Sequence, residues 1–120
     1  MEFLKRNALK FLSEAEEAFV RRDYSFTMFF VEQFFQLALK YILYKKYGDF
    51  LKTHSLRTLF ELTRDSSLVS YYRCNLDLLR EIELSYIASR YMDVEYSEEV
   101  ARKALNLAET SGGDSYERVL

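Results

Sequence analysis

Apolar residues recur every three or four positions along most of this chain, the spacing that places them on one face of an α-helix. Residues 2–22 carry such a stripe over an arc of roughly 120° on a helical projection, with most of the charged side chains off it. We therefore predict a first helix that lies on the surface and buries one face.

The second segment, residues 24–47, is apolar and largely aromatic over roughly 220° of the same projection. Glu32, Gln33, Gln36 and Lys40 form the narrow polar strip that remains. Such a helix is either central in its own domain or shared with a partner. We expect the second arrangement, a homodimer through this aromatic helix, because a small bundle does not easily surround one helix and symmetric dimers commonly cover apolar faces.

Capping residues mark where the helices end and begin. Gly48 fits the left-handed position that ends a helix, and a short connector follows it. Residues able to cap the remaining helices come next: Thr53 or Ser55, Asp65 or Ser66, Asn75, and Ser97. Short connections favour antiparallel neighbours, so we predict an all-α, up-and-down bundle of four or five helices. It spans residues 1–112 as a single domain, and residues 113–120 form a flexible tail.

The composition agrees with this fold class. A chain of 120 residues with 49% hydrophobic residues and a net charge of −2 has enough apolar material for one core. Three glycines and no proline are too few for the turns of an all-β domain. One histidine and one cysteine exclude a structural zinc site and a disulfide framework, and nothing in the sequence indicates a metal or cofactor.

Two expectations concern where the protein works. The sequence has neither an N-terminal signal nor an apolar run near 18 residues, so we expect a cytoplasmic protein without membrane contact. Thermolabile amides are scarce, with three Asn and two Gln, which suggests a thermophile. Sampling noise in a short chain explains that scarcity equally well.

Two residues are candidates for chemistry. His54 lies at a predicted helix start with Lys52 and Arg57 nearby, so it is either an anion contact or general acid/base, or a structural histidine. Arg90 falls at the edge of a buried stripe, where its guanidinium needs a bound phosphate, a carbonyl or a carboxylate such as Glu83 or Asp93.

Several segments, taken in order, resemble the HEPN domain family of small helical proteins. They are the aromatic stretch 29–40 followed by Tyr47-Gly48, then Thr53-His54-Ser55-Leu56, Tyr86-Ile87-Ala88-Ser89-Arg90-Tyr91, and Tyr96-Ser97-Glu98-Glu99-Val100-Ala101. The resemblance implies a dimerising helical bundle, often encoded beside a minimal nucleotidyltransferase in a toxin–antitoxin-like pair. Family members are linked to nucleotide binding or to metal-independent RNA cleavage.

The family's cleaving members carry an Arg followed four to six residues later by a His, and this pair is missing here. No His follows Arg90, and the only His precedes it. We therefore expect a homodimeric binding module for a nucleotide or a nucleotidyltransferase partner, and we assign no catalytic residue. A ribonuclease toxin with a non-standard site and a purely structural dimer stay open. The candidate ligand-binding residues are Arg90, His54, Lys52, Arg57 and Asp93, and Tyr91 and Tyr96 are candidates for modification by the partner.

Overall fold

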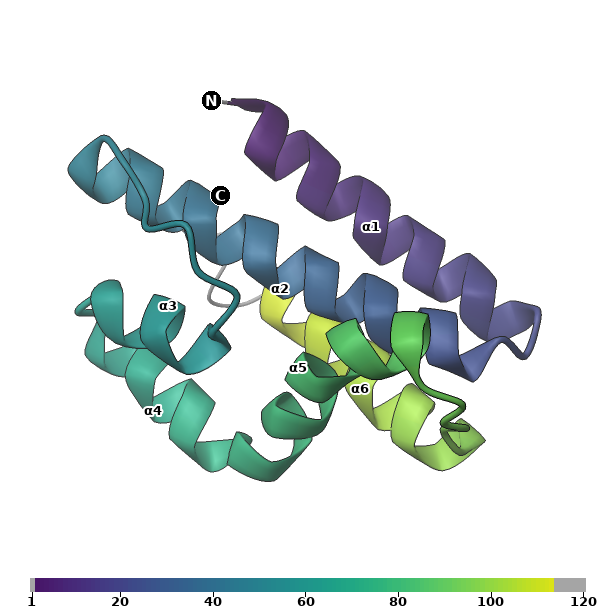
Figure 1. Cartoon of the computed structure of the whole chain (residues 1–120). Helices are drawn as coiled ribbons and strands as arrows, with labels where there is room; N and C mark the ends of the chain where they lie inside the picture. The colour runs from purple at the N-terminus through teal and green to yellow at the C-terminus, as the bar shows by residue number, and fades with distance from the viewer. Residues whose placement is uncertain (1, 114–120) are drawn as a thin grey trace.

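Six α-helices make up the computed structural model, which describes residues 2–113, and this part of the chain contains no strand (Figure 1). The helices are α1 (Glu2–Val20), α2 (Tyr24–Tyr47), α3 (Leu56–Leu62), α4 (Ser66–Cys74), α5 (Leu76–Tyr91) and α6 (Glu98–Gly113). The predicted all-α bundle is confirmed, with one helix more than expected because α3 and α4 are separate short helices. Apart from residue 113, the predicted tail lies outside the described residues.

Most of the predicted caps are present. Gly48 is left-handed, with φ 80°, and its amide donates to the Tyr44 carbonyl at 2.7 Å. Ser55 and Asp65 each accept hydrogen bonds from first-turn amides of α3 and α4, and Ser97 accepts one from Val100. Asn75 precedes α5, but its side chain does not cap that helix. Its amide nitrogen instead donates to the Tyr71 carbonyl of the preceding helix, so Asn75 helps to end α4.

Helix α2 is the centre of the molecule. It contacts α1, α3, α5 and α6, and twelve of its residues are buried within the chain. The two large aromatic residues Phe34 and Phe35 are fully buried. Helix α2 is thus central in its own domain, and the expected homodimer through this helix stays a prediction. Helix α1 packs along α2, the short α3 packs on the C-terminal half of α2, and α5 and α6 lie against the rest (Figure 1).

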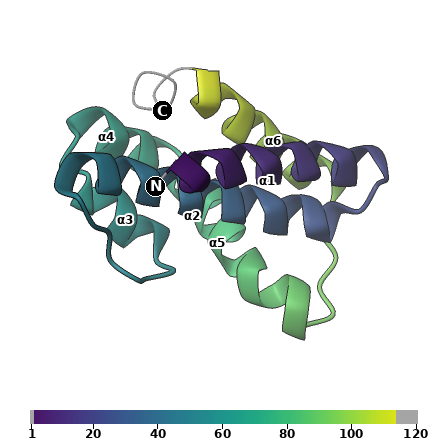
Figure 2. The same ribbon diagram turned by 90° about the horizontal axis from the view of Figure 1, so that it is seen from above.

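The remaining helices differ in how much of their surface they bury. Figure 2 shows α5 standing out from the layer formed by α1 and α2, so that only one side of α5 packs on the core. Helices α3 and α4 lie side by side at one end of the bundle, next to the start of α5. Among the described residues, no helix combines the length and the apolar character needed to cross a membrane.

Candidate functional site

His54 and Arg90 lie against the same aromatic ring, that of Tyr86. The His54 and Tyr86 rings are stacked, with centroids 4.6 Å apart and planes 27° apart. The guanidinium carbon of Arg90 lies 4.4 Å from the Tyr86 ring centroid. The imidazole and the guanidinium are therefore separated by at most the sum of these distances, about 9 Å. The face of an electron-rich ring attracts a cation, which accounts for the position of the Arg90 guanidinium, whereas the His54 imidazole stacks on the same ring.

The Tyr86 ring is itself held by α2. Its plane lies 19° from that of Phe29, with the ring centroids 6.3 Å apart. One turn further along α5, the Ser89 hydroxyl donates to the Ser25 carbonyl at 3.1 Å. These two contacts fix the C-terminal end of α5 on the start of α2. Arg90 follows Tyr86 by four residues, one turn along the same helix, so its guanidinium reaches the Tyr86 ring.

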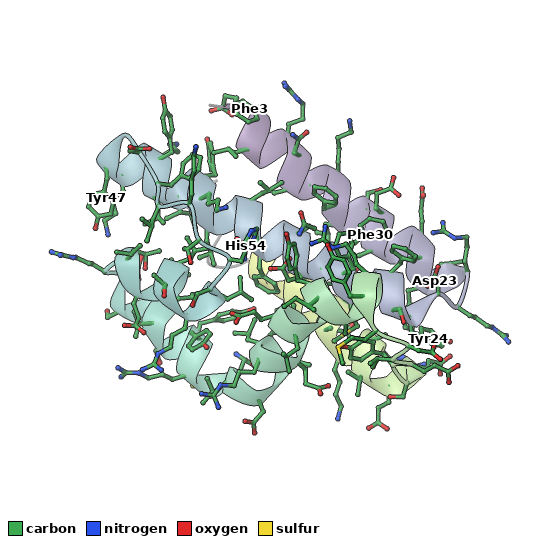
Figure 3. All side chains as sticks on the ribbon, in the orientation of Figure 1. Phe3, Asp23, Tyr24, Phe30, Tyr47 and His54 are labelled. Carbon is green, nitrogen blue, oxygen red and sulfur yellow. The ribbon has the colours of Figure 1, made fainter. Side chains whose placement is uncertain are left out.

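His54 is positioned by the start of α3. The Ser55 hydroxyl accepts a hydrogen bond from the Thr58 amide, and the Thr53 hydroxyl accepts one from the Ser55 amide. The His54 carbonyl accepts a hydrogen bond from the Gln36 side chain of α2 at 2.7 Å. Figure 3 shows His54 near the middle of the molecule, beside α2. The backbone on both sides of the imidazole is thus tied down while its ring is exposed.

The start of α3 is occupied by a carboxylate of the protein itself. The Leu56 amide donates to Glu83 Oε1 at 2.7 Å. First-turn amides of a helix lack intrahelical partners and attract anions, and the Glu83 carboxylate is the anion at this helix start. A ligand anion at this helix start, which the sequence suggested, is therefore displaced by Glu83. Within residues 2–113, Glu83 also forms no ion pair with Arg90, so the suggested pairing of these two residues is absent.

A buried polar group lies directly beneath His54. Gln36 donates both to the His54 carbonyl and to Glu32 Oε2, and Gln33 donates to Glu32 Oε1. Glu32 is fully buried, and burial raises its carboxyl pKa to about 7 against the lowering effect of these two amides. Glu83 raises this pKa further, and Lys40 lowers it. Glu32 and Gln36 of the polar strip thus face the interior, whereas Gln33 and Lys40 are half-buried.

The His54 imidazole and the Arg90 guanidinium are available to a ligand. His54 and Arg90 are both exposed, and within residues 2–113 neither side chain forms an ion pair. Arg90 also lies 5.2 Å from the Tyr91 ring centroid. A guanidinium offers five N–H donors in a planar fork that matches phosphate and carboxylate oxygens. An imidazole adds a donor, a positive charge when protonated, or a proton acceptor.

The other predicted ligand residues do not join this cluster. Arg57 forms an ion pair with Glu61 at 2.8 Å and lines a cavity between α3, α4 and α5. Lys52 is exposed on the connector, and Asp93 is exposed just beyond α5. Neither of these two forms an ion pair in the part of the chain that is described, so Asp93 is not the partner of Arg90.

The two tyrosines proposed for modification differ in access. Tyr91 is 74% exposed at the end of α5. Tyr96 is half-buried and packs against the hydrophobic core. Burial, and to a smaller extent Glu81, raise the pKa of its hydroxyl. Tyr91 is therefore the one whose hydroxyl a second protein can reach without rearrangement.

Three residues of this site were not identified as such from sequence. Tyr86 lies on the apolar stripe of α5, and Glu32 and Gln36 are the polar residues of an otherwise apolar helix. The available signal was that polar strip: a carboxylate and an amide one turn apart in so apolar a helix indicate a buried hydrogen-bonded pair. No group of three His, Cys, Asp or Glu side chains in residues 2–113 is placed to hold a metal ion.

A sequence model of the HEPN domain family matches residues 1–110, which takes in nearly all of the six helices. No curated protein and no solved structure gave a significant match to the chain.

Proposed function

The chain belongs to the HEPN domain family, and from this premise we propose that it is a homodimeric binding module for a nucleotide phosphate, working beside a minimal nucleotidyltransferase in a toxin–antitoxin-like pair. The observation that carries the binding role is the meeting of exposed His54 and Arg90 on the Tyr86 ring. Phosphate oxygens complement these donors, and a purine base stacks on exposed aromatic rings such as that of Tyr91.

Titration calorimetry with ATP and GTP tests the binding role. We expect saturable heat for the wild type and an affinity about tenfold or more weaker for Arg90→Gln, because a charge-assisted hydrogen bond contributes about 1.5–3 kcal/mol. Arg6→Gln is the matched control, since it removes one exposed arginine from α1, away from the cluster. No heat from the wild type, or equal affinities for the two variants, contradicts the proposal.

The homodimer is better supported by α5 than by α2. Leu84, Ile87 and Tyr91 are 63%, 51% and 74% exposed, and their spacing places them on one outward stripe of α5. Four other residues of the same helix form its buried face: Leu79, Ile82, Ser85 and Ala88. A helix that is apolar on two faces needs two partners, and its own core supplies only one. A second copy packed on this stripe places Arg90 at the dimer interface.

The nucleotidyltransferase partner rests on the family resemblance and on one structural feature. The Tyr91 hydroxyl is exposed beside Arg90, where a bound nucleotide or partner can reach it. Co-expression with a small nucleotidyltransferase encoded next to this protein tests the pairing. We expect a mass increase of one nucleotide unit that Tyr91→Phe abolishes and Tyr96→Phe retains. An unchanged mass and no co-purification contradict it.

Metal-independent RNA cleavage is the second candidate, and the closeness of His54 to Arg90 favours it. His54 accepts the proton of a ribose 2′-hydroxyl, whose oxygen attacks phosphorus while Arg90 binds the phosphate. The bond from phosphorus to the 5′-oxygen breaks, and this oxygen takes a proton from water. The products are a 2′,3′-cyclic phosphate and a 5′-hydroxyl. Growth arrest on expression, with cleavage lost in His54→Gln and in Arg90→Gln, supports this reaction. Intact RNA after incubation with the pure protein excludes it.

A further inference from the structure

A second concave site lies at the opposite end of α5. It is a cavity of about 220 Å³ enclosed by α3, α4 and the first turns of α5, the three elements grouped at one end of the bundle in Figure 1. Three arginines line it, one from each helix: Arg57, Arg73 and Arg80. Its apolar lining includes Phe60, and Phe60 is fully buried in the core beneath.

The charges around this cavity are not balanced. Arg57 is paired with Glu61, the one carboxylate among the described residues that line the cavity. Arg73 and Arg80 are exposed, and neither forms an ion pair with any other described residue. Two guanidinium groups that face one pocket repel each other unless an anion lies between them. The positive charges of Arg73 and Arg80 therefore favour binding of a negatively charged ligand in this pocket.

A buried hydroxyl completes the set of donors. Tyr72 lines the same cavity and packs its ring on Phe60, with the centroids 5.2 Å apart. Burial, followed by Glu83, raises the pKa of this hydroxyl, whereas Arg80 and Arg57 act in the opposite direction. Arg57 and Arg80 thus lie close enough to Tyr72 to influence the pKa of its hydroxyl, and all three residues line the same cavity.

This cavity is distinct from the His54, Tyr86 and Arg90 cluster. Arg80 and Arg90 are ten residues apart on α5, which is about 15 Å along a helix axis. Of the described residues that line the cavity, none belongs to that cluster. Binding in the cavity therefore does not depend on the function proposed for the other cluster.

We propose that this cavity binds a small organic phosphate monoester. Arg73 and Arg80 contact the phosphate oxygens with the Tyr72 hydroxyl as a further donor, and the carbon skeleton rests on Val69 and Leu76. Both apolar residues line the cavity, and mixed linings of this kind are typical of small-molecule sites. A dianionic phosphate matches two guanidinium groups better than a monoanionic carboxylate does.

Phenyl phosphate is a suitable probe, with inorganic phosphate and phenol as its separate halves. In an NMR titration of the full chain we expect saturable shifts at amides of α3, α4 and the start of α5 with phenyl phosphate. We expect weaker binding of inorganic phosphate and no saturation with phenol. Equal affinity for phenyl phosphate and inorganic phosphate overturns the assignment of an organic ligand, and no saturable shift overturns the site.

Paired variants separate the site from general charge. The double variant Arg73→Gln, Arg80→Gln should weaken phenyl phosphate binding about tenfold or more. Arg6→Gln combined with Arg21→Gln removes the same charge from exposed positions on and just after α1 and should leave the affinity unchanged. Tyr72→Phe keeps the ring and tests the hydroxyl if the double variant unfolds. Arg90→Gln should not change the affinity, and equal weakening in both double variants overturns the proposal.

Discussion

His54 and Arg90 are 36 positions apart in the sequence, yet both lie within 4.6 Å of the Tyr86 ring centroid. In the family's ribonucleases the two residue types come from one short segment, with the histidine after the arginine. Here the histidine comes from the start of α3 and the arginine from the end of α5. The order along the chain is reversed, but the fold still brings an imidazole and a guanidinium together.

The Tyr86 ring is predicted to be the element that organises this cluster. Tyr86→Phe keeps the ring and should bind ATP with nearly the affinity of the wild type. Tyr86→Leu removes the surface on which His54 and Arg90 rest, and a cation–π contact contributes about 0.5–2 kcal/mol. We therefore expect calorimetry to give an affinity weaker by about threefold to thirtyfold for Tyr86→Leu. Equal affinities for the two variants contradict this role.

The sequence predicts the helices more reliably than it predicts this cluster. The bounds of α2 follow from local features: the helical spacing of its apolar residues, and Gly48 at its end. At its start, the Asp23 side chain accepts a hydrogen bond from the Phe26 amide. The inward direction of Glu32 and Gln36 is not local, because it depends on the connector and α3 packing over that side of α2. The closeness of His54 to Arg90 depends in turn on Tyr86, whose ring is placed by Phe29. Such contacts between distant segments have no signature in the spacing of residues.

Glu83 is predicted to stabilise the start of α3. Glu83→Ala leaves the Leu56 amide without its carboxylate acceptor, and a buried donor that loses its partner costs about 1–3 kcal/mol. Urea denaturation should show this loss in the free energy of unfolding. Glu81→Ala is the control, because Glu81 lies on the exposed side of the same helix and should change stability by less than about 0.5 kcal/mol. Equal losses in the two variants contradict the assigned role.

Glu32 should make the stability of the protein depend on pH. Its pKa is raised to about 7 in the folded state by burial, against an ordinary value of 4.5. A carboxyl whose pKa is raised on folding favours the folded state when it is protonated. Its contribution is therefore full below about pH 4.5 and is lost as the pH rises toward and past 7. The loss is on the order of 3 kcal/mol over this range.

Denaturation curves of the wild type and Glu32→Gln at several pH values test this effect. The difference in unfolding free energy should shift in favour of Glu32→Gln as the pH rises, because its amide does not ionise. A second carboxyl, Glu109, also has a pKa raised to about 7, chiefly by its hydrogen bond with Glu16. Glu109 is present in both proteins, so the difference between them isolates Glu32. A difference that stays constant from pH 4 to pH 8 contradicts the prediction.

The exposed stripe of α5 is predicted to hold two copies of the chain together. Leu84→Asp and Ile87→Asp put a charge where the symmetric partner packs, and a charge buried without a partner strongly disfavours association. We expect light scattering after gel filtration to give a dimer of two 14.4 kDa chains for the wild type and a monomer for either variant. Val20→Asp is the control, since Val20 is 81% exposed at the end of α1 and should leave the dimer intact. A monomeric wild type rules out the dimer, and a dimer that survives both α5 substitutions moves the interface elsewhere on the surface.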